Sequence, residues 1–412
     1  MTSFIRLKEE ILDHELCTSC GLCAAVCPGG FVSMSADTVS LPVFRESLER
    51  SREICLDCSL CSDVCPGYDT GMLESELRIF GRNRSEEERW TGINQSTYQL
   101  TTTNQDVLKR VAAGGAGTTL AITALEEQIA DAVIVVGRDR EQPWVPKAYV
   151  ADSPQAIIEC AQTSYSLTPN LDLLNDPRYE RVGIIGVPCQ IQGINKLLNL
   201  PESSAASPLA RKVAFTIELG CASNTSRAGT EHLITEILGI PLEKVVYMRY
   251  REGEYPGQFV VRTDEGEEYT LPFYRLVEEF KKFKTFRCLS CADWWSGIAD
   301  ISISDGDPNI FDSSKNGKSV KPSSTVMVRT DTGKRLIEAA LRRGAIELTD
   351  YVFSNNLGLE RKRQRYRSYV ERGDRKIPLA PGSDSKYSRI LTDEEVIQNG
   401  IGSEQGEPVR NL

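Results

Sequence analysis

Thirteen of the 412 residues are cysteine, and eight of them form two runs with the same spacing. Each run reads Cys-x2-Cys-x2-Cys-x3-Cys-Pro, and the runs cover residues 17–28 and 55–66. In iron–sulfur proteins, three thiolates of such a run bind one [4Fe–4S] cluster and the fourth binds a second cluster. The spacing therefore predicts two clusters that carry single electrons. One is expected on Cys17, Cys20, Cys23 and Cys65, and the other on Cys55, Cys58, Cys61 and Cys27.

Two other uses of the eight thiols are weaker. Paired zinc sites favour Cys-x2-Cys pairs that are separated by longer spacers. Disulfides are rare in the cytosol, and the charged segment 1–16 lacks the apolar centre of a signal peptide. No stretch approaches the roughly 18 apolar residues of a membrane span. We therefore expect a cytoplasmic protein with no integral membrane segment, and association with a membrane complex stays open.

Composition excludes further classes of protein. The chain is 40% hydrophobic and 26% charged, which is typical of a globular protein. Its formal net charge of −10 argues against nucleic acid as a partner. The chain has two histidines, His14 and His232, which makes a His-rich metal site implausible and weakens the case for a triad hydrolase.

A third set of cysteines lies in the second half of the chain. Cys189 and Cys221 each follow a predicted strand, and Cys288 and Cys291 form a Cys-x2-Cys pair. The carboxyl ends of parallel strands meet at one edge of a sheet, where open α/β folds build their sites. Four thiolates there could hold a third cubane, but the spacing alone leaves zinc, a redox pair and inert buried thiols open. Cys160 is expected to be a packed free thiol.

The elements around these cysteines predict a mixed α+β and α/β protein, with an N-terminal bacterial-type ferredoxin domain followed by an α/β flavin-binding core. Apolar β-branched runs predict buried strands over 132–137, 182–186 and 213–219, and short strands over 245–271. Helices are expected over 190–198, 229–238 and 332–343, and an exposed loop or lid over 312–324. The expected boundaries are 1–81 for the two-cluster domain, 82–105 for a linker, 106–350 for the core, and 351–412 for a basic helix and tail. The basic run 361–372 is either a solvated face or a docking surface.

A core of this kind needs a mediator between two-electron and one-electron chemistry. Clusters move single electrons, whereas many biological donors give hydride, and a flavin connects the two. The glycine-rich stretch 114–119 could cradle a pyrophosphate at a helix start. It matches neither the dinucleotide fingerprint nor the P-loop, and a glycine patch that packs a helix is the alternative.

Over roughly residues 105–345 the chain resembles the beta subunits of coenzyme F420-reducing hydrogenases and dehydrogenases. In that family the four core cysteines hold a [4Fe–4S] cluster beside FAD, which implies the same role for Cys189, Cys221, Cys288 and Cys291. The resemblance also implies FAD contacts at Gly114, Gly115, Thr118, Thr163, Tyr165, Asn170 and Pro188. It rests on Gly114-Gly115, Thr163-Ser164-Tyr165, Pro169-Asn170, Pro188-Cys189-Gln190, Cys221, Cys288 and Cys291, Ala299-Asp300, Ser324-Thr325-Val326 and Arg329-Thr330.

The order of the parts resembles the electron-input subunit of F420H2 dehydrogenases. The implied path runs from F420H2 to FAD, to the core cluster, and out through the N-terminal pair to another redox subunit or a ferredoxin-type acceptor. The resemblance assigns no catalytic side chain, because the protein mainly positions two rings. The chain departs from the family at Gln162 and Ser164, where glycine and lysine are usual. Two alternatives remain: a ferredoxin-dependent reductase of another organic substrate, and a non-catalytic electron relay.

Overall fold

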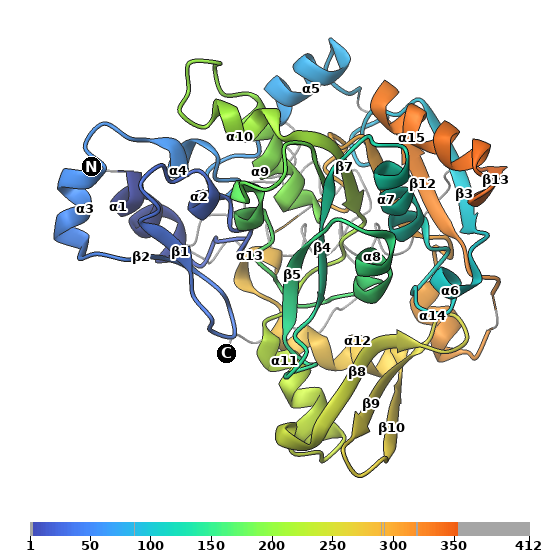
Figure 1. The fold of residues 1–412 in the computed structure, drawn as a ribbon. Coiled ribbons are helices and arrows are strands. Elements are labelled where there is room, and N and C mark those ends of the chain that lie inside the picture. Colours follow the sequence, from blue (N-terminus) through green and yellow to red (C-terminus); the bar gives the residue numbers. More distant parts are fainter. Residues whose placement is uncertain (1–2, 86, 290, 292, 319, 353–412) are drawn as a thin grey trace, which may run out of the picture.

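The computed structural model describes residues 3–85, 87–289, 291, 293–318 and 320–352. Its N-terminal unit, residues 3–80, is built from short elements around the two cysteine runs; in Figure 1 the elements from α1 to α4 lie on the left and α5 lies at the top. Gly21 is left-handed at the start of α2, with a φ of 87°, which suits the turn that wraps Cys20 and Cys23. The elements are α1 (Ser3–Leu7), a π-helical turn (Lys8–Leu12), α2 (Leu22–Ala25), β1 (Val32–Met34), β2 (Pro42–Phe44), α3 (Leu48–Ile54), α4 (Leu60–Asp63) and α5 (Met72–Phe80).

An eight-stranded mixed sheet forms the centre of the molecule, in the order β13-β3-β12-β11-β7-β6-β4-β5. The four strands β4, β6, β7 and β11 run parallel to one another, so their carboxyl ends share one edge. The remaining strand pairs are antiparallel. The bounds are β3 (Ser96–Thr102), β4 (Ala132–Arg138), β5 (Pro146–Ala151), β6 (Val182–Gly186), β7 (Val213–Leu219), β11 (Ile301–Asp305), β12 (Ser324–Val328) and β13 (Ile346–Asp350).

Each face of the sheet has its own hydrophobic core, because successive residues of a strand point to opposite sides. In β4, Val133 and Val135 pack with α7 (Ala116–Glu126), α8 (Pro154–Cys160) and α15 (Asp331–Arg342). Ile134 belongs to the other core, with α9 (Pro188–Leu198) and α10 (Ser207–Arg211). That second core also contains residues of the N-terminal unit, such as Leu22, Val64 and Met72. The N-terminal unit is therefore packed directly on the α9 face.

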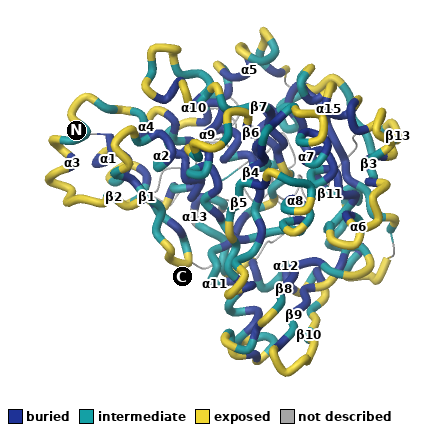
Figure 2. Tube along the Cα trace, in the orientation of Figure 1, coloured by how far each residue is buried: buried dark blue, intermediate teal, exposed yellow. Residues whose placement is uncertain are grey.

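A three-stranded antiparallel sheet forms the lower lobe in Figure 1. Its core contains Tyr250, Phe259 and Leu276. Figure 2 shows that buried residues follow the large sheet, whereas exposed ones collect on α3 and on the turns of this lobe. The lobe comprises α11 (Arg227–His232), a π-helical segment (Leu233–Ile237), β8 (Val245–Glu252), β9 (Gln258–Thr263), β10 (Glu268–Pro272) and α12 (Phe273–Phe280).

The structure confirms the predicted strands β4, β6 and β7, the short strands of the lower lobe, and helices α9 and α15. The expected linker 82–105 is wrong in part, because β3 pairs with β12 and β13 inside the large sheet. Its sequence, STYQLTT, looked polar because five of its seven side chains are only half-buried. The expected loop 312–324 begins within a helix, α14 (Ile310–Lys315). The predicted basic helix 361–372 and the tail lie outside the described residues.

No helix in the described part of the chain is long and apolar enough to cross a membrane.

Candidate functional site

The eight N-terminal cysteines form two mixed groups in space. Cys17 interacts electrostatically with Cys65 and Cys20, and Cys23 interacts with Cys17, Cys20 and Cys65. In these interactions Cys17, Cys20 and Cys23 of the first run lie near Cys65 of the second, and the assignment of a cluster to them stays a prediction. In the second group, Cys61 interacts with Cys58, Cys55 and Cys27.

Backbone and hydroxyl groups surround these sulfurs. The amide of Ser19 donates to Cys17 Sγ, and the amide of Gly67 donates to Cys65 Sγ, each at 3.3 Å. Ser3 Oγ lies 2.8 Å from Cys61 Sγ. Donors of this kind stabilise thiolates and tune the potential of an iron–sulfur cluster. We therefore regard both groups as suited to cubanes.

The two groups differ in their distance from solvent. Burial raises the pKa of the Cys65 thiol to about 12, and the nearby Cys20 adds to the rise. The Cys17 group faces the core of the molecule, since the amides of Asn170 and Leu171 donate to Cys20 O. The other group lies at the surface, where the side chain of Leu56, next to Cys55, is 73% exposed.

The third set of cysteines gathers beyond the carboxyl ends of β6 and β7. Cys189 is the second residue of α9 and interacts electrostatically with Cys221, Cys288 and Cys291. Burial, the largest cause, raises its pKa well above the usual value, and the neighbouring thiols add to the rise. Asn224 connects two members, because its amide donates to Cys288 Sγ at 3.4 Å and its Nδ2 to Cys221 Sγ at 3.7 Å.

Four half-buried thiols in one place suit a bound cation, since each thiolate disfavours ionisation of the others. A [4Fe–4S] cluster takes four thiolates, so the donor set fits that group. Among the described residues, no three His, Cys, Asp or Glu side chains are arranged as ligands of a single ion. Metal analysis therefore decides between a cubane and zinc. Cys160 stands apart from this set, on α8, and its sulfur packs against Gly137.

Helix α9 runs from the core cysteine set to the N-terminal unit. Cys189 lies at its start, and Gly193, one turn later, faces the N-terminal unit. A Cβ at Gly193 would lie 3.3 Å from Leu22 Cδ2, so glycine lets the two units approach closely. Two turns after Cys189, Lys196 Nζ donates to the carbonyl oxygen of Cys65 at 3.1 Å. One rigid element thus touches both cysteine sets.

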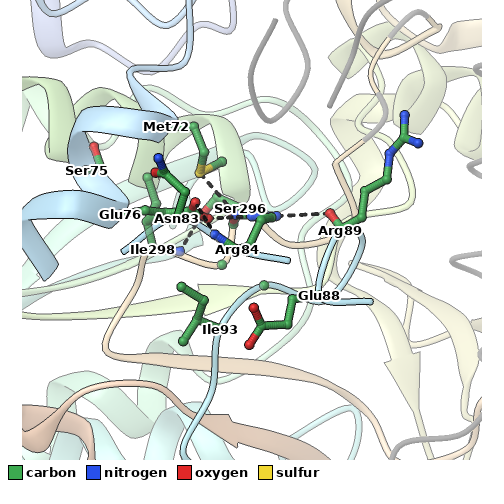
Figure 3. Close-up of polar contacts among 12 residues, drawn as sticks. Met72, Ser75, Glu76, Asn83, Arg84, Glu88, Arg89, Ile93, Ser296 and Ile298 are labelled. Atoms are coloured by element: carbon green, nitrogen blue, oxygen red, sulfur yellow. Dashed lines mark hydrogen bonds and ion pairs between the residues drawn. The ribbon is translucent and has the colours of Figure 1, made fainter. Parts of the chain in front are cut away.

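A buried ion pair fastens the chain that follows Cys291. Arg84 pairs with Glu76 of α5, and both side chains are almost fully buried. Figure 3 shows that Arg84 also bonds Met72, Ser296 and Arg89, with Nη2 at 2.6 Å from Ser296 O. The amide and hydroxyl of Ser296 in turn donate to Glu218 of β7. These contacts hold the segment after Cys291 between α5 and the sheet.

The glycine-rich stretch lies at the start of α7, near the carboxyl edge of the sheet. Gly115 is the left-handed residue before the helix, with a φ of 80°. Gly114 packs against two strands, because a Cβ there would lie 2.5 Å from the Ser324 amide and closer still to Leu100 O. Thr118 is half-buried in the first turn. Close packing therefore accounts for Gly114, while the helix start keeps its anion-binding capacity.

The remaining predicted FAD contacts fall into two places. The carbonyl of Thr163 accepts a hydrogen bond from Arg138 Nη2 at 2.9 Å, and the ring of Tyr165 meets Tyr250 edge-on. Asn170 and Pro188 lie elsewhere. Asn170 bonds Ile185 O through Nδ2 and Cys20 O through its amide, and Pro188 opens α9 beside Cys189. These two residues therefore lie beside the cysteine sets and apart from Thr163 and Tyr165.

Two arginines that the motifs did not single out lie at the same edge. Arg251 of β8 donates to both oxygens of Asp305, at 2.9 and 3.1 Å, at the end of β11. Burial raises the pKa of Tyr165 to about 12, although Arg251 opposes the rise. Arg138, at the end of β4, lies 4.4 Å from the Tyr250 ring centroid. A charged residue directly after a buried strand was the available signal for Arg138 and Asp305.

Several polar atoms at this edge are buried without a hydrogen-bond partner among the described residues. They include Nε and Nη1 of Arg138, Nη2 of Arg251, Oε1 of Gln162 and Oγ of Ser164. Each such atom costs about 1–3 kcal/mol unless a ligand or water satisfies it. Gln162 and Ser164 are two of the positions where the chain departs from the family pattern.

Two runs with two-cluster spacing, packed on a mixed α/β sheet that gathers four more cysteines, define an iron–sulfur oxidoreductase component. The chain belongs to the family of coenzyme F420 hydrogenase/dehydrogenase beta subunits. Residues 97–175 match the N-terminal model of that family and residues 179–352 match its C-terminal model. Residues 16–68 match a 4Fe-4S dicluster domain, which confirms the ferredoxin-like domain before the α/β core.

Known proteins of this kind align over most of the chain. The coenzyme F420 hydrogenase beta subunit of Methanosarcina barkeri is 28% identical over 296 residues, which are 71% of this chain and 94% of that protein. An F(420)H(2) dehydrogenase subunit of Methanosarcina mazei is 24% identical, over 80% of this chain and 83% of that protein. The solved F420-reducing [NiFe] hydrogenase complex from Methanosarcina barkeri contains a chain with a TM-score of 0.56 and 26% identity, over 70% of this chain and 95% of that one.

Proposed function

We propose that this chain transfers electrons between reduced coenzyme F420 and a one-electron partner through FAD and three [4Fe–4S] clusters. The observation that carries the proposal is the succession of three cysteine groups from the sheet edge to the surface. The core group begins α9, the same helix reaches Cys65 of the next group, and Cys65 interacts with Cys61 of the outermost group. Such a succession suits stepwise transfer of single electrons.

The sheet edge supplies what a flavin dinucleotide needs. The first amides of α7 suit a diphosphate, since a helix start carries partial positive charge. The unpaired donors of Arg138 and Arg251 and the unpaired oxygens of Gln162 and Ser164, all among the described residues, suit the polar groups of a bound ring system. When bound there, FAD exchanges hydride with a two-electron donor and single electrons with a cluster. The side chains bind and orient the two rings.

The outermost group provides the exit to a partner. Leu56 and Asp57 separate Cys55 from Cys58, and both intervening residues are exposed. An exposed leucine beside a cluster suits docking of another redox subunit or a ferredoxin-type acceptor. Electrons that arrive from the core then leave the chain at this face.

A second candidate is a ferredoxin-dependent reductase of another organic substrate, with electrons flowing inward. Gln162 and Ser164 favour it, because they replace the glycine and lysine usual in the family, and their oxygens are buried without a partner among the described residues. A site built from different polar groups selects a different substrate. The two candidates share all cofactors and differ in the compound that reacts with the flavin.

The test is cofactor content of the anaerobic protein, followed by a visible spectrum on addition of F420H2. Four iron atoms per cluster predict about twelve iron atoms, with one FAD per chain, and bleaching of both chromophores. A Cys189→Ser variant should fall to about eight iron atoms, whereas the matched Cys160→Ser variant should keep about twelve. Zinc in place of the missing iron, or absence of flavin, would contradict the proposal. Full cofactors with no bleaching would favour the second candidate.

A further inference from the structure

Lys196 is a buried lysine beside a cluster cysteine. Its residue exposure is only 9%, and its ammonium donates to Cys65 O at 3.1 Å, to Asp69 O at 3.4 Å and to Asp69 Oδ2 at 2.8 Å. Lysine is almost never buried to this extent unless it is paired, because desolvation of a charge is expensive. The stem of the side chain lies against Gly71, where a Cβ would come within 2.9 Å of Lys196 Cγ. The fold therefore makes room for this cation.

The ion pair with Asp69 leaves a net positive field at the cysteine. The Asp69 side chain is 65% exposed, so water screens its charge, whereas the lysine is shielded from water. The ammonium of Lys196 donates to the backbone of Cys65 itself, so its charge lies beside that cysteine. A buried cation faces the Cys17, Cys20, Cys23 and Cys65 group from the core.

We propose that Lys196 is a positioning residue that raises the reduction potential of the cluster held by the Cys65 group. The inference rests on the proposed function, because it requires a cluster at this group. Reduction adds one electron to the cluster and makes it one unit more negative, without forming or breaking a bond. A neighbouring buried cation stabilises that extra charge, since net charge and hydrogen bonds around a cluster set its potential.

Lys196 lies on the same helix as Cys189 of the core group. It follows Cys189 by seven residues, which is about two turns and about 10 Å along the helix axis. Residues at this spacing lie on the same face of the helix, and Gly193 and Lys196 contact the N-terminal unit there. The helix that supplies a thiol to the core group therefore also supplies the cation that draws electrons to the next group.

The test is a potentiometric titration of the anaerobic holoprotein, followed by electron paramagnetic resonance. Lys196→Met should shift one of three one-electron steps to lower potential, with at least a tenfold loss in the ratio of reduced to oxidised cluster, or 59 mV. Lys196→Arg keeps the charge and should restore the step. Asp69→Asn removes the screened countercharge and should shift the same step to higher potential. The control is Lys212→Met. Lys212 donates to the carbonyl oxygen of Asp176, and both residues lie outside the two cysteine runs.

The inference predicts shifts of the potential in opposite directions for Lys196→Met and Asp69→Asn. Lys196→Met and Asp69→Asn break the same ion pair, so a purely structural role predicts shifts of one sign or none, and either result would overturn the inference. If Lys196→Met loses its cluster, the Asp69→Asn and Lys196→Arg titrations still decide. A wild-type protein with no cluster at this group would instead refute the proposed function, which iron analysis reveals before any titration.

Discussion

Replacement of Arg84 by methionine should lower the free energy of unfolding by about 3–5 kcal/mol, which is the usual loss when one partner of a buried pair is removed. Glu76, which has no exposed surface, would keep the amide of residue 84 as a donor but lose its cation. Ser296 O would lose a donor at 2.6 Å, and Arg89 O one at 3.1 Å. Methionine fills part of the volume, so the loss arises mainly from the stranded carboxylate and carbonyls.

The assay is urea unfolding of the anaerobic protein by circular dichroism. With a slope of about 3 kcal/mol per molar urea, the midpoint should fall by about 1 M or more. The matched control is Arg82→Met, which breaks a more exposed pair with Glu88 and should shift the midpoint much less. A double variant, Arg84→Met with Glu76→Leu, should recover much of the loss, because an apolar pair can replace a buried ion pair. Equal midpoints for Arg84→Met and Arg82→Met would refute the reasoning.

Three further outcomes follow from the structure. Gly114→Ala places a Cβ 2.5 Å from a strand amide, so it should lower the free energy of unfolding by about 1–3 kcal/mol and lower the flavin content. The control is Gly117→Ala, whose added Cβ would have its nearest neighbour at 3.9 Å. It should change neither quantity in the same thermal and flavin assays. Leu56→Glu should slow electron transfer to a protein acceptor but not to a small dye, while the control Leu341→Glu, at another exposed leucine, should change neither rate. The hydrogen bond from Arg82 holds the pKa of Glu88 at about 2, below the usual 4.5. The stabilisation from this ion pair is therefore complete above pH 4.5 and is lost as pH falls toward 2. The difference in urea midpoint between wild type and Arg82→Met should therefore shrink on acidification through this range, and a constant difference would contradict the assignment.

Local patterns were sufficient for some parts of the molecule and misleading for others. The strands 132–138 and 182–186 are buried on both faces, so their unbroken apolar runs identified them. Strand β3 also has a neighbouring strand on each side but a polar sequence, since most of its side chains are half-buried. Its place is set by pairing with β12 and β13, which lie more than 200 residues away in the chain, and no local period reports such a partner.

The sequence by itself predicted the ferredoxin-like domain and its two crossed cysteine groups, because the ligation of such clusters depends on cysteine spacing within a few residues. The third cysteine set was assigned from the resemblance of motifs along the chain, because spacing alone left zinc, a redox pair and inert thiols open for Cys189, Cys221, Cys288 and Cys291. Only the tertiary structure decided how the groups are connected and charged. Lys196, Asp69, Arg84 and Glu76 carry no motif, and their roles exist because distant segments bury them against one another. A charge that is buried in a low-dielectric interior acts more strongly on its neighbours than a charge at the surface, and the fold decides which charges are buried.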